Sequence, residues 1–371
     1  MNTANRITMP APLRDYLRGA PVAEQMRDLR KLSTWRFCSA VACNYLVIAA
    51  VVVVVTAVVP ALGTLSQPTT IAVVGLTGLV GIVIIAARQH ALLVLMHEGA
   101  HRTVSNNRLV NDLLSDLLCG APLLVSMRGY RSDHLAHHQH LNTCADPDWC
   151  RKTADQQQRS QWLFPTTQPL LQMLAKLYGY SVTYLLHSLA ANRAVSATVK
   201  NSAHAELQPS NKTLGWFRLG LYVVSAAVLT MTNAWISFVI FWLAPMLLVL
   251  PLIMRIRSIA EHFALTHDHP LRQSRTVRAG WLERALIAPH HIGLHIDHHL
   301  LASVPFYNLP ALHRLLLDCP YYASNAHLNE GYFMPRRHGY RDIPVAPGST
   351  TLAQDMYTLP SARLPPILSG A

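Results

Sequence analysis

Histidines at helical spacing are the residues of this chain best suited to chemistry. HEGAH, at residues 97–101, places His97 and His101 four residues apart, on one face of a helix. With Glu98 they form the HExxH pattern of zinc proteases, in which the histidines bind the metal and the glutamate activates water. The same letters also read as HxxxH, a pair of iron ligands. The rest of the sequence has to decide between these two chemistries.

Two later clusters repeat a second spacing. All 20 histidines lie after residue 89, and many gather in DHLAHHQH and HHIGLHIDHH. In each cluster the spacing i, i+3, i+4 places three imidazoles on one helical face, where they can converge on one metal centre. The candidate ligands in these clusters are His134, His137, His138, His291, His295, His298 and His299.

The number of clustered histidines favours iron over a protease zinc. A catalytic zinc takes three protein ligands and keeps one position for water, so HExxH would need only one more residue. The other clustered histidines would then have no role. Two metal ions with open positions could use them all, and nitrogen-rich sites suit iron among the redox metals. We expect surface or hydrogen-bonding roles for the isolated histidines, such as His187, His204, His313 and His327.

The composition predicts a membrane protein that must hold these clusters at one surface. Of the 371 residues, 51% are hydrophobic and only 13% are charged. Four apolar segments are long enough to cross a bilayer as helices. They lie at about 41–62, 71–95, 214–232 and 234–254. Short turns separate the members of each pair, so we expect two hairpins, the first of which brings His97 and His101 to the membrane face.

The distribution of lysine and arginine predicts the orientation of these spans. Seven basic residues precede the first span, whereas the turns at 62–70 and 232–233 carry none. By the positive-inside rule, both termini and the central segment 96–213 are cytoplasmic. The apolar but interrupted stretches at 109–127 and about 165–190 are typical of amphipathic helices on the membrane surface. All the histidine clusters would then lie on the cytoplasmic side.

We divide the chain into three parts. Residues 1–38 form a polar cytoplasmic tail that lacks the early apolar run of a cleavable signal peptide. Residues 39–335 form the membrane domain. Residues 336–371 have the proline and serine content of a flexible tail.

Charge and cysteine content bear on the partners. The net charge of +12 raises nucleic acid as a partner, but no nucleic-acid module or aromatic-interleaved basic stripe accompanies it. Anionic lipid head groups and an acidic redox protein explain the charge better. The six cysteines form no CxxC pair, which indicates free thiols, and the chain has no dinucleotide fingerprint, haem-attachment motif or iron–sulfur cysteine set. Electrons for redox chemistry must therefore come from a separate protein.

The three histidine boxes carry a family resemblance. HEGAH, DHLAHH and HIDHH, with four spans and the first two boxes after the second span, resemble the integral-membrane fatty acid desaturase superfamily. The flanking stretches HLNTCADPDW and HHLLASVPFYNLPALH are also similar to family sequences. The resemblance covers roughly residues 40–315. It implies an all-α integral membrane fold with four transmembrane helices in two hairpins and a cytoplasmic helical cap that holds a histidine-rich di-iron site.

The resemblance also implies a ligand set. His262 lies where the family often supplies a further histidine, although a membrane-interface histidine paired with Glu261 would look the same. Ser258, one turn earlier, stands where some relatives have a polar ligand, but serine is a poor iron ligand and is not carried over. The implied metal ligands are His97, His101, His134, His137, His138, His262, His291, His295, His298 and His299. Glu98, Asp133, Glu261 and Asp297 are expected to orient ligating imidazoles through hydrogen bonds.

The function that the resemblance implies is an oxygen-dependent di-iron desaturase, which introduces a double bond into an acyl-lipid or similar hydrophobic substrate. It would use two iron ions, O2 as co-substrate and electrons from a ferredoxin or other electron-transfer protein, in a bacterial inner membrane if the source is prokaryotic. The alternative on the same scaffold is a hydroxylase or ketolase that acts on a lipid, a carotenoid or a small secondary metabolite. A membrane zinc protease is a remote alternative, and a metal transporter is disfavoured because no histidine lies midway along a span. Trp149, Trp162, Tyr130 and Tyr178 could line a substrate channel, although interfacial anchoring is the commoner role.

Overall fold

The computed structural model describes residues 9–59, 66–142, 146–148, 179, 211–262, 265 and 269–332. Within these ranges the chain is mostly helical, and the only strands are two of three residues each. The longer helices are α1 (Ala11–Arg18), α2 (Ala20–Leu29), α3 (Thr34–Val53), α5 (Gln67–Ala100), α6 (Arg108–Ser115), α7 (Met127–His140), α11 (Asn211–Met231), α13 (Leu250–His262) and α16 (Leu309–Leu317). The shorter elements are η1 (Val54–Val58), η2 (Asp116–Gly120), η3 (Ala121–Leu123), α12 (Trp235–Phe238), η7 (Val239–Leu243), η8 (Pro245–Val249), β1 (Thr276–Arg278), α14 (Trp281–Leu286), η9 (Pro289–His291), α15 (His295–Leu300), η10 (Phe306–Asn308), α17 (Pro320–Asn325) and β2 (Leu328–Glu330).

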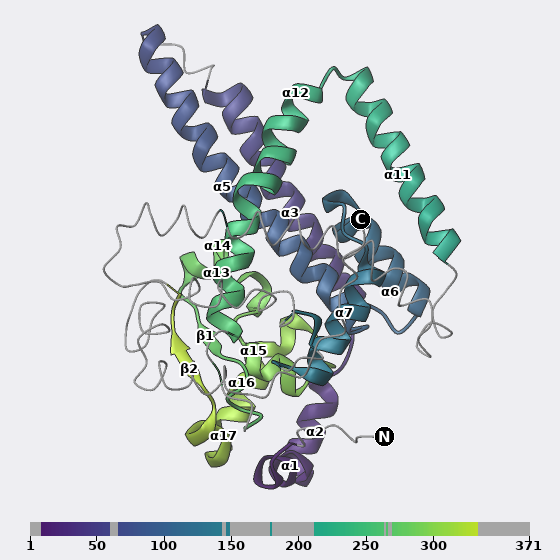
Figure 1. Ribbon diagram of the computed structural model, residues 1–371, viewed down its shortest axis with the longest axis vertical. Helices are drawn as coiled ribbons and strands as arrows, with labels where there is room; N and C mark the ends of the chain where they lie inside the picture. Colours follow the sequence, from purple (N-terminus) through teal and green to yellow (C-terminus); the bar gives the residue numbers. More distant parts are fainter. Residues whose placement is uncertain are drawn as a thin grey trace, which may run out of the picture.

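Four helices are long and apolar enough to cross a membrane, which confirms the predicted number of spans. They cover Thr34–Val58, Gln67–Ala100, Leu214–Met231 and Trp235–His262. β-Branched runs such as Val51–Val55 are weak helix formers in water, but in lipid the backbone must satisfy its own hydrogen bonds and the helix is favoured. Figure 1 shows these helices projecting from one end of the structure, with α3 packed along α5.

The α5 helix is longer than a bilayer requires. Its 34 residues rise about 51 Å at 1.5 Å each, against roughly 30 Å of hydrocarbon. Side chains before Ile85 are mostly exposed, whereas nearly all those from Ile85 to Ala100 are enclosed by protein. The last turns of α5 therefore lie inside the protein, beyond the apolar part of the span, and they carry the first histidine pair.

The other elements gather at the opposite end of the molecule in Figure 1. β1 and β2 pair in parallel, with Thr276 opposite Leu328 and Arg278 opposite Glu330. The all-α prediction missed these strands because each has only three residues.

The N-terminal segment, predicted as a polar tail, forms two helices in its described part. α1 and α2 bury Leu13 and Met26 in a cluster with Ile296, Leu312 and Tyr322 of the third-box region. Two hydrogen bonds reinforce this packing: the Tyr16 hydroxyl donates to Leu315 O at 2.9 Å, and Asn308 Nδ2 donates to Leu29 O at 2.8 Å. The segment before the first span thus supports the histidines of α15.

Residues 109–127, predicted to be an amphipathic surface helix, form α6, η2 and η3. Together with α7 they are long and apolar enough for one span, but the two halves meet at 99°. Gly120, at the end of η2, packs against the break between the halves, where an added Cβ would lie 2.7 Å from Val125 O. Apart from Gly179, the predicted stretch at 165–190 lies outside the described residues, and so does the tail at 336–371. The same holds for Trp149, Trp162, Tyr178, His187, His204, Cys144 and Cys150.

Candidate metal centre

The first histidine pair lies at the C-terminal end of α5, with His97 in its last turn and His101 directly after it. His97 and His101 follow one another by four residues, and the helix ends as Arg102 takes the left-handed conformation at φ 60°. Gly99 between them packs against α6, where an added Cβ would lie 2.2 Å from Ser115 Oγ. A glycine is therefore required for α5 and α6 to approach this closely.

The second box lies on one face of α7. Ser126 caps this helix by accepting a hydrogen bond from Gly129 N at 3.4 Å. His134 and His137 are buried and His138 is half-buried. All three imidazoles meet others of the cluster, as their spacing predicted.

The third box lies on the six-residue helix α15. Two consecutive left-handed residues, His290 at φ 54° and His291 at φ 61°, turn the chain before it. Gly293 then passes β1, where an added Cβ would lie 2.7 Å from Val277 O. These turns aim His295, His298 and His299 at the other boxes.

One group of five imidazoles converges on a common centre. Each imidazole contributes one ring nitrogen, and these five nitrogens all lie within 4.8 Å of one another. The Nε2 atom of His134 lies 2.8 Å from Nε2 of His101 and 3.0 Å from Nε2 of His138. Nε2 of His138 in turn lies 3.2 Å from Nε2 of His298. The members are His97, His101, His134, His138 and His298.

A second centre adjoins the first. His137, His262 and His299 form one group, and Glu261, His262 and His295 form another that shares His262. The Nε2 atom of His295 is 2.7 Å from that of His262 and 3.0 Å from that of His299. Because His138 and His299 stack with ring centroids 4.1 Å apart, the two centres are neighbours.

These residues fit metal binding better than hydrogen bonding to one another. Two nitrogens that bind one ion at about 2.1 Å and at right angles would lie about 3 Å apart, as several pairs here do. Both ring nitrogens of His97 are buried without a hydrogen-bond partner among the described residues. Burial lowers the pKa of His101 to about 3 and also lowers the pKa values of His298 and His299, so these rings are neutral, as metal ligation requires. A site rich in nitrogen, with no thiolate among the described residues that form it, suits iron.

Asp146 orients one ligand and was not singled out from the sequence. Its Oδ2 lies 2.9 Å from His137 Nδ1 and accepts a hydrogen bond from Asn142 N, while Oδ1 accepts one from Asp148 N, both at 2.9 Å. A buried carboxylate on the distal ring nitrogen fixes the tautomer of a metal ligand. The signal was present in HLNTCADPDW, which had served only to support the resemblance.

The four acids predicted to orient imidazoles differ in their contacts. Glu98 Oε1 lies 3.7 Å from His97 Nδ1, beyond a hydrogen bond, and Oε2 accepts from Thr103 and from Phe306 N. Glu261 accepts from Arg257 at 2.7 Å, and its Oε2 is 3.5 Å from His295 Nε2, which makes it a candidate ligand as well.

Asp297 instead contacts residues outside the cluster. It lies 2.8 Å from His313 Nδ1 and accepts a hydrogen bond from the Tyr322 hydroxyl. This corrects the role expected for it, because in the short α15 helix its side chain points away from the face that carries the ligands. Asp133 is half-buried beside His134 and joins none of the metal-binding groups found in the described residues.

His291 and Ser258 do not join the centres. His291 is half-buried at the turn before α15 and belongs to none of the groups found among the described residues. Its left-handed backbone separates it from the face that His295 begins. Ser258 Oγ is buried with no hydrogen-bond partner in the described part of the chain.

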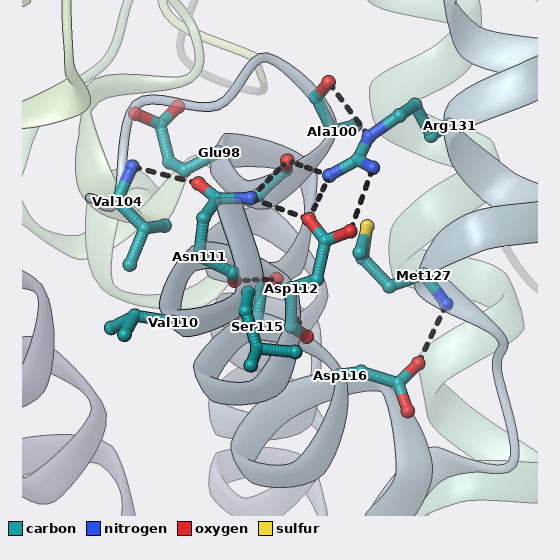
Figure 2. Close-up of polar contacts among 12 residues, drawn as sticks. Glu98, Ala100, Val104, Val110, Asn111, Asp112, Ser115, Asp116, Met127 and Arg131 are labelled. Carbon is teal, nitrogen blue, oxygen red and sulfur yellow. Dashed lines mark hydrogen bonds and ion pairs between the residues drawn. The ribbon is translucent and has the colours of Figure 1, made fainter. Parts of the chain in front are cut away.

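A buried ion pair joins the first two boxes (Figure 2). Arg131 of α7 donates from Nη1 to Asp112 Oδ2 at 3.1 Å and from Nη2 to Oδ1 at 2.5 Å. It also donates to the carbonyls of Gly99 and Ala100 at 2.7 and 3.2 Å, and Asn111 Nδ2 donates to Gly99 O at 2.9 Å. We call Arg131, Asp112 and Asn111 the helix clamp, because they bind the end of α5 to α6 and α7. No sequence pattern singled out this clamp.

Comparisons with known proteins agree with this geometry. A sequence model described as fatty acid desaturase matches residues 70–330. The chain is 23% identical to the dihydrorhizobitoxine desaturase of Bradyrhizobium elkanii, over 71% of this chain and 74% of that protein. It is 26% identical to the sn-1 oleoyl-lipid 12-desaturase of Synechocystis, over 60% of this chain and 63% of that protein. It is 25% identical to the sn-1 acyl-lipid omega-3 desaturase (ferredoxin) of Nostoc, over 59% of this chain and 61% of that protein. The matches span less than two thirds of the two acyl-lipid desaturases.

Proposed function

Because the chain belongs to the fatty acid desaturase family, we propose that it is an oxygen-dependent di-iron enzyme that introduces a double bond into an acyl-lipid or similar hydrophobic substrate. The observation that carries this proposal is the convergence of nine imidazoles on two neighbouring centres at one end of four apolar helices. An oxidoreductase of this family needs such a centre next to a membrane.

The residues of the site fall into those that would bind iron and those that position the iron ligands. The first centre would hold one iron through the group of five histidines, and the second would hold another through His137, His262, His295 and His299, with Glu261 beside them. Iron bound there would supply the activation of dioxygen and the removal of hydrogen from an unactivated C–H bond. The protein itself positions the imidazoles through Asp146 and the helix clamp, and it buries or half-buries all of them.

The substrate class is supported by the setting of the site. The enclosed part of α5 that leads to the histidines continues directly from its apolar span, which favours a substrate that is dissolved in the bilayer. Among the relatives, two are named for acyl-lipid substrates and one for dihydrorhizobitoxine. A hydroxylase outcome needs the same centre and differs in which bond forms after the first hydrogen is removed, so substrate position within about an ångström could decide between them.

The electron source and the orientation are part of the proposal. A relative named as a ferredoxin-dependent desaturase supports an external electron-transfer protein. The net charge of +12 would favour an acidic carrier. The basic residues before the first span support a cytoplasmic location of the metal centre and of both termini.

Metal analysis and product analysis test the proposal. Detergent-purified wild-type protein is expected to hold about two iron ions per chain, and His137→Ala and His298→Ala are each expected to lower this content. Reconstituted with lipid, ferredoxin and its reductase, the enzyme should form a product that lacks two hydrogens, whereas a product that gains oxygen would identify a hydroxylase. One zinc per chain that is lost only with His97→Ala would support the protease chemistry of HExxH and overturn the proposal.

A further inference from the structure

The short helix α14 carries apolar side chains on the outside of the protein. Trp281 and Leu282 are 76% and 50% exposed, although α14 lies outside the four apolar spans and leads toward the third histidine box. A tryptophan exposed to this extent is unusual on a surface that faces only water. What covers these two side chains depends on the depth at which α14 lies relative to the membrane.

Two spans show where the hydrocarbon of the membrane ends. α5 contains no Asp, Glu, Lys or Arg over residues 67–87, and this stretch rises about 30 Å, which is the thickness of the hydrocarbon core. The fourth span contains none over residues 235–254. Arg88 and Arg255 are therefore the first charged residues that follow each apolar stretch. The edge of the hydrocarbon on the side of the metal centre lies near Arg88.

The α14 helix lies at this edge. Arg88 Nη2 donates to Ala285 O, which is a carbonyl of α14. Ile287, directly after α14, belongs to the same buried cluster as Ala87 of α5 and Ile253 of α13. In Figure 1, α14 lies where the projecting helices meet the rest of the structure. The exposed side of α14 is therefore continuous with the lipid-facing surface of the spans.

Interior contacts hold α14 in this orientation. Glu283, the only acid in residues 276–291, is buried. Its Oε2 accepts a hydrogen bond from Gly280 N at 3.1 Å, and its Oε1 accepts one from Tyr332 N at 2.7 Å. Because the carboxylate is bound inside the protein, α14 keeps Trp281 on the outside.

The exposed charge of α14 is basic. Arg284 is exposed, whereas the only acid of the helix is buried. Tryptophan is enriched at the membrane–water interface, and a basic residue near an anionic lipid surface contributes about 1 kcal/mol of binding free energy. Trp35 and Arg36, both exposed at the start of the first span, form a second pair of the same kind. The composition of the α14 surface thus matches the head-group region of a bilayer.

We propose that α14 is an interfacial helix that binds the bilayer, with Trp281 and Leu282 at the upper acyl chains and Arg284 at the phosphate of an anionic phospholipid. The bilayer fits this surface better than a second copy of the chain does, because the copy carries the same net charge of +12. The inference goes beyond the proposed reaction and does not depend on it. Since α14 leads through η9 to α15, the bound helix would hold the third box at a fixed depth.

Quenching of tryptophan fluorescence tests the depth of α14. The full chain is placed in nanodiscs of phosphatidylcholine, either unmodified or brominated near the head-group end of the acyl chains. The emission of Trp281, taken as wild type minus Trp281→Phe, should be mostly lost in the brominated lipid. As a control, Ala323→Trp in the Trp281→Phe chain moves the indole to an exposed position on α17, far from the spans in Figure 1, and its emission should be retained.

Energy transfer from Trp281 tests the head-group preference. In micelles of a nonionic detergent, the full chain is titrated with phosphatidylglycerol or phosphatidylcholine, each with a dansyl group on one acyl chain. The signal is again the difference from the matching Trp281→Phe chain. Phosphatidylglycerol should reach half-saturation at about fivefold lower content than phosphatidylcholine, which corresponds to one basic residue at the head group.

Variants connect the preference to Arg284. Arg284→Gln should remove the preference for phosphatidylglycerol. Arg314→Gln, which removes an exposed positive charge from α16, should keep it. Melting temperatures within about 2 °C of wild type verify that each variant folds.

Three results would overturn the proposal: emission of Trp281 that survives in brominated lipid as well as that of the α17 control, equal half-saturation of wild type by the two lipids, or a preference that survives in Arg284→Gln. None of them depends on turnover. A chain that held no iron and formed no alkene could still show the quenching and the preference, and an active desaturase could lack both.

Discussion

Two regions along α5 differ in whether the buried polar groups there are paired. At its C-terminal end, the helix clamp pairs charge with charge: Arg131 binds both oxygens of Asp112 and two backbone carbonyls. Nearer the membrane, Gln89 and His90 are as deeply buried but keep unpaired atoms. The difference separates polar groups that are fully paired within the described structure from polar groups that are buried with atoms left unpaired.

Removal of one partner from the helix clamp is the severest way to test this comparison. Arg131→Met leaves Asp112 as a buried, unpaired carboxylate and should lower the free energy of unfolding by about 3–5 kcal/mol. The double variant Arg131→Met with Asp112→Leu should recover much of this loss. Denaturant titration in mixed micelles measures both. A loss below about 1 kcal/mol in the single variant would show that the clamp is not structural.

Asp146 tests whether a paired carboxylate can act on the metal centre. Asp146→Asn keeps the size of the side chain but removes the charge that fixes the tautomer of His137, so iron affinity should fall about 10–100-fold. Competition with a chelator measures this affinity. Asp297→Asn is the matched comparison, since its carboxylate contacts His313 and Tyr322; it should lower the melting temperature and leave iron affinity unchanged.

Gly99 tests how closely the clamped end of α5 must approach α6. Gly99→Ala forces its methyl group onto Ser115 and should cost about 1–3 kcal/mol of unfolding free energy, with some loss of iron. Ser115→Gly in the same chain should relieve the clash and restore most of the stability. A Gly99→Ala variant as stable as wild type would mean that the two helices can separate without consequence.

Gln89 should give the smallest effect because it lies in the unpaired region. Gln89→Leu loses one hydrogen bond to Trp242 O but also removes an unpaired buried oxygen, so the two terms nearly cancel. We expect a change in unfolding free energy within about 1 kcal/mol, measured by the same titration. A loss as large as that of Arg131→Met would erase the contrast between the two regions of α5.

Much of the candidate site could be predicted from local spacing. The patterns HxxxH and HxxHH fix imidazoles on one face of a helix, and the eight histidines that they contain meet at the two centres. The ninth, His262, was implied only by the family resemblance. His291 does not join them, because a left-handed turn that no spacing reveals separates it from α15. The four spans followed from hydropathy, although α5 runs five residues past its predicted end at residue 95.

The supporting contacts could not be predicted, because they join residues that are far apart in the sequence or whose pairing depends on tertiary structure. Asp112 and Arg131 are separated by 19 residues and meet only because α6 and α7 bend by 99°. Asp297 stands between two ligands in the sequence but faces His313, since the direction of its side chain depends on where the short α15 helix begins. The helices α1 and α2 were not predicted, because their few apolar residues form a buried cluster only by packing against α16 and α17.

The uninterrupted course of α5 has a mechanical consequence. One rigid rod of 34 residues begins among lipid-facing side chains and ends at His97 and His101, with no break that could absorb a change of tilt. A bilayer that thickens or thins tilts such a helix to match its hydrophobic length. The helix would transmit that change of tilt to the imidazoles of His97 and His101. The thickness of the surrounding membrane would then be one of the quantities that set the geometry of the candidate metal centre.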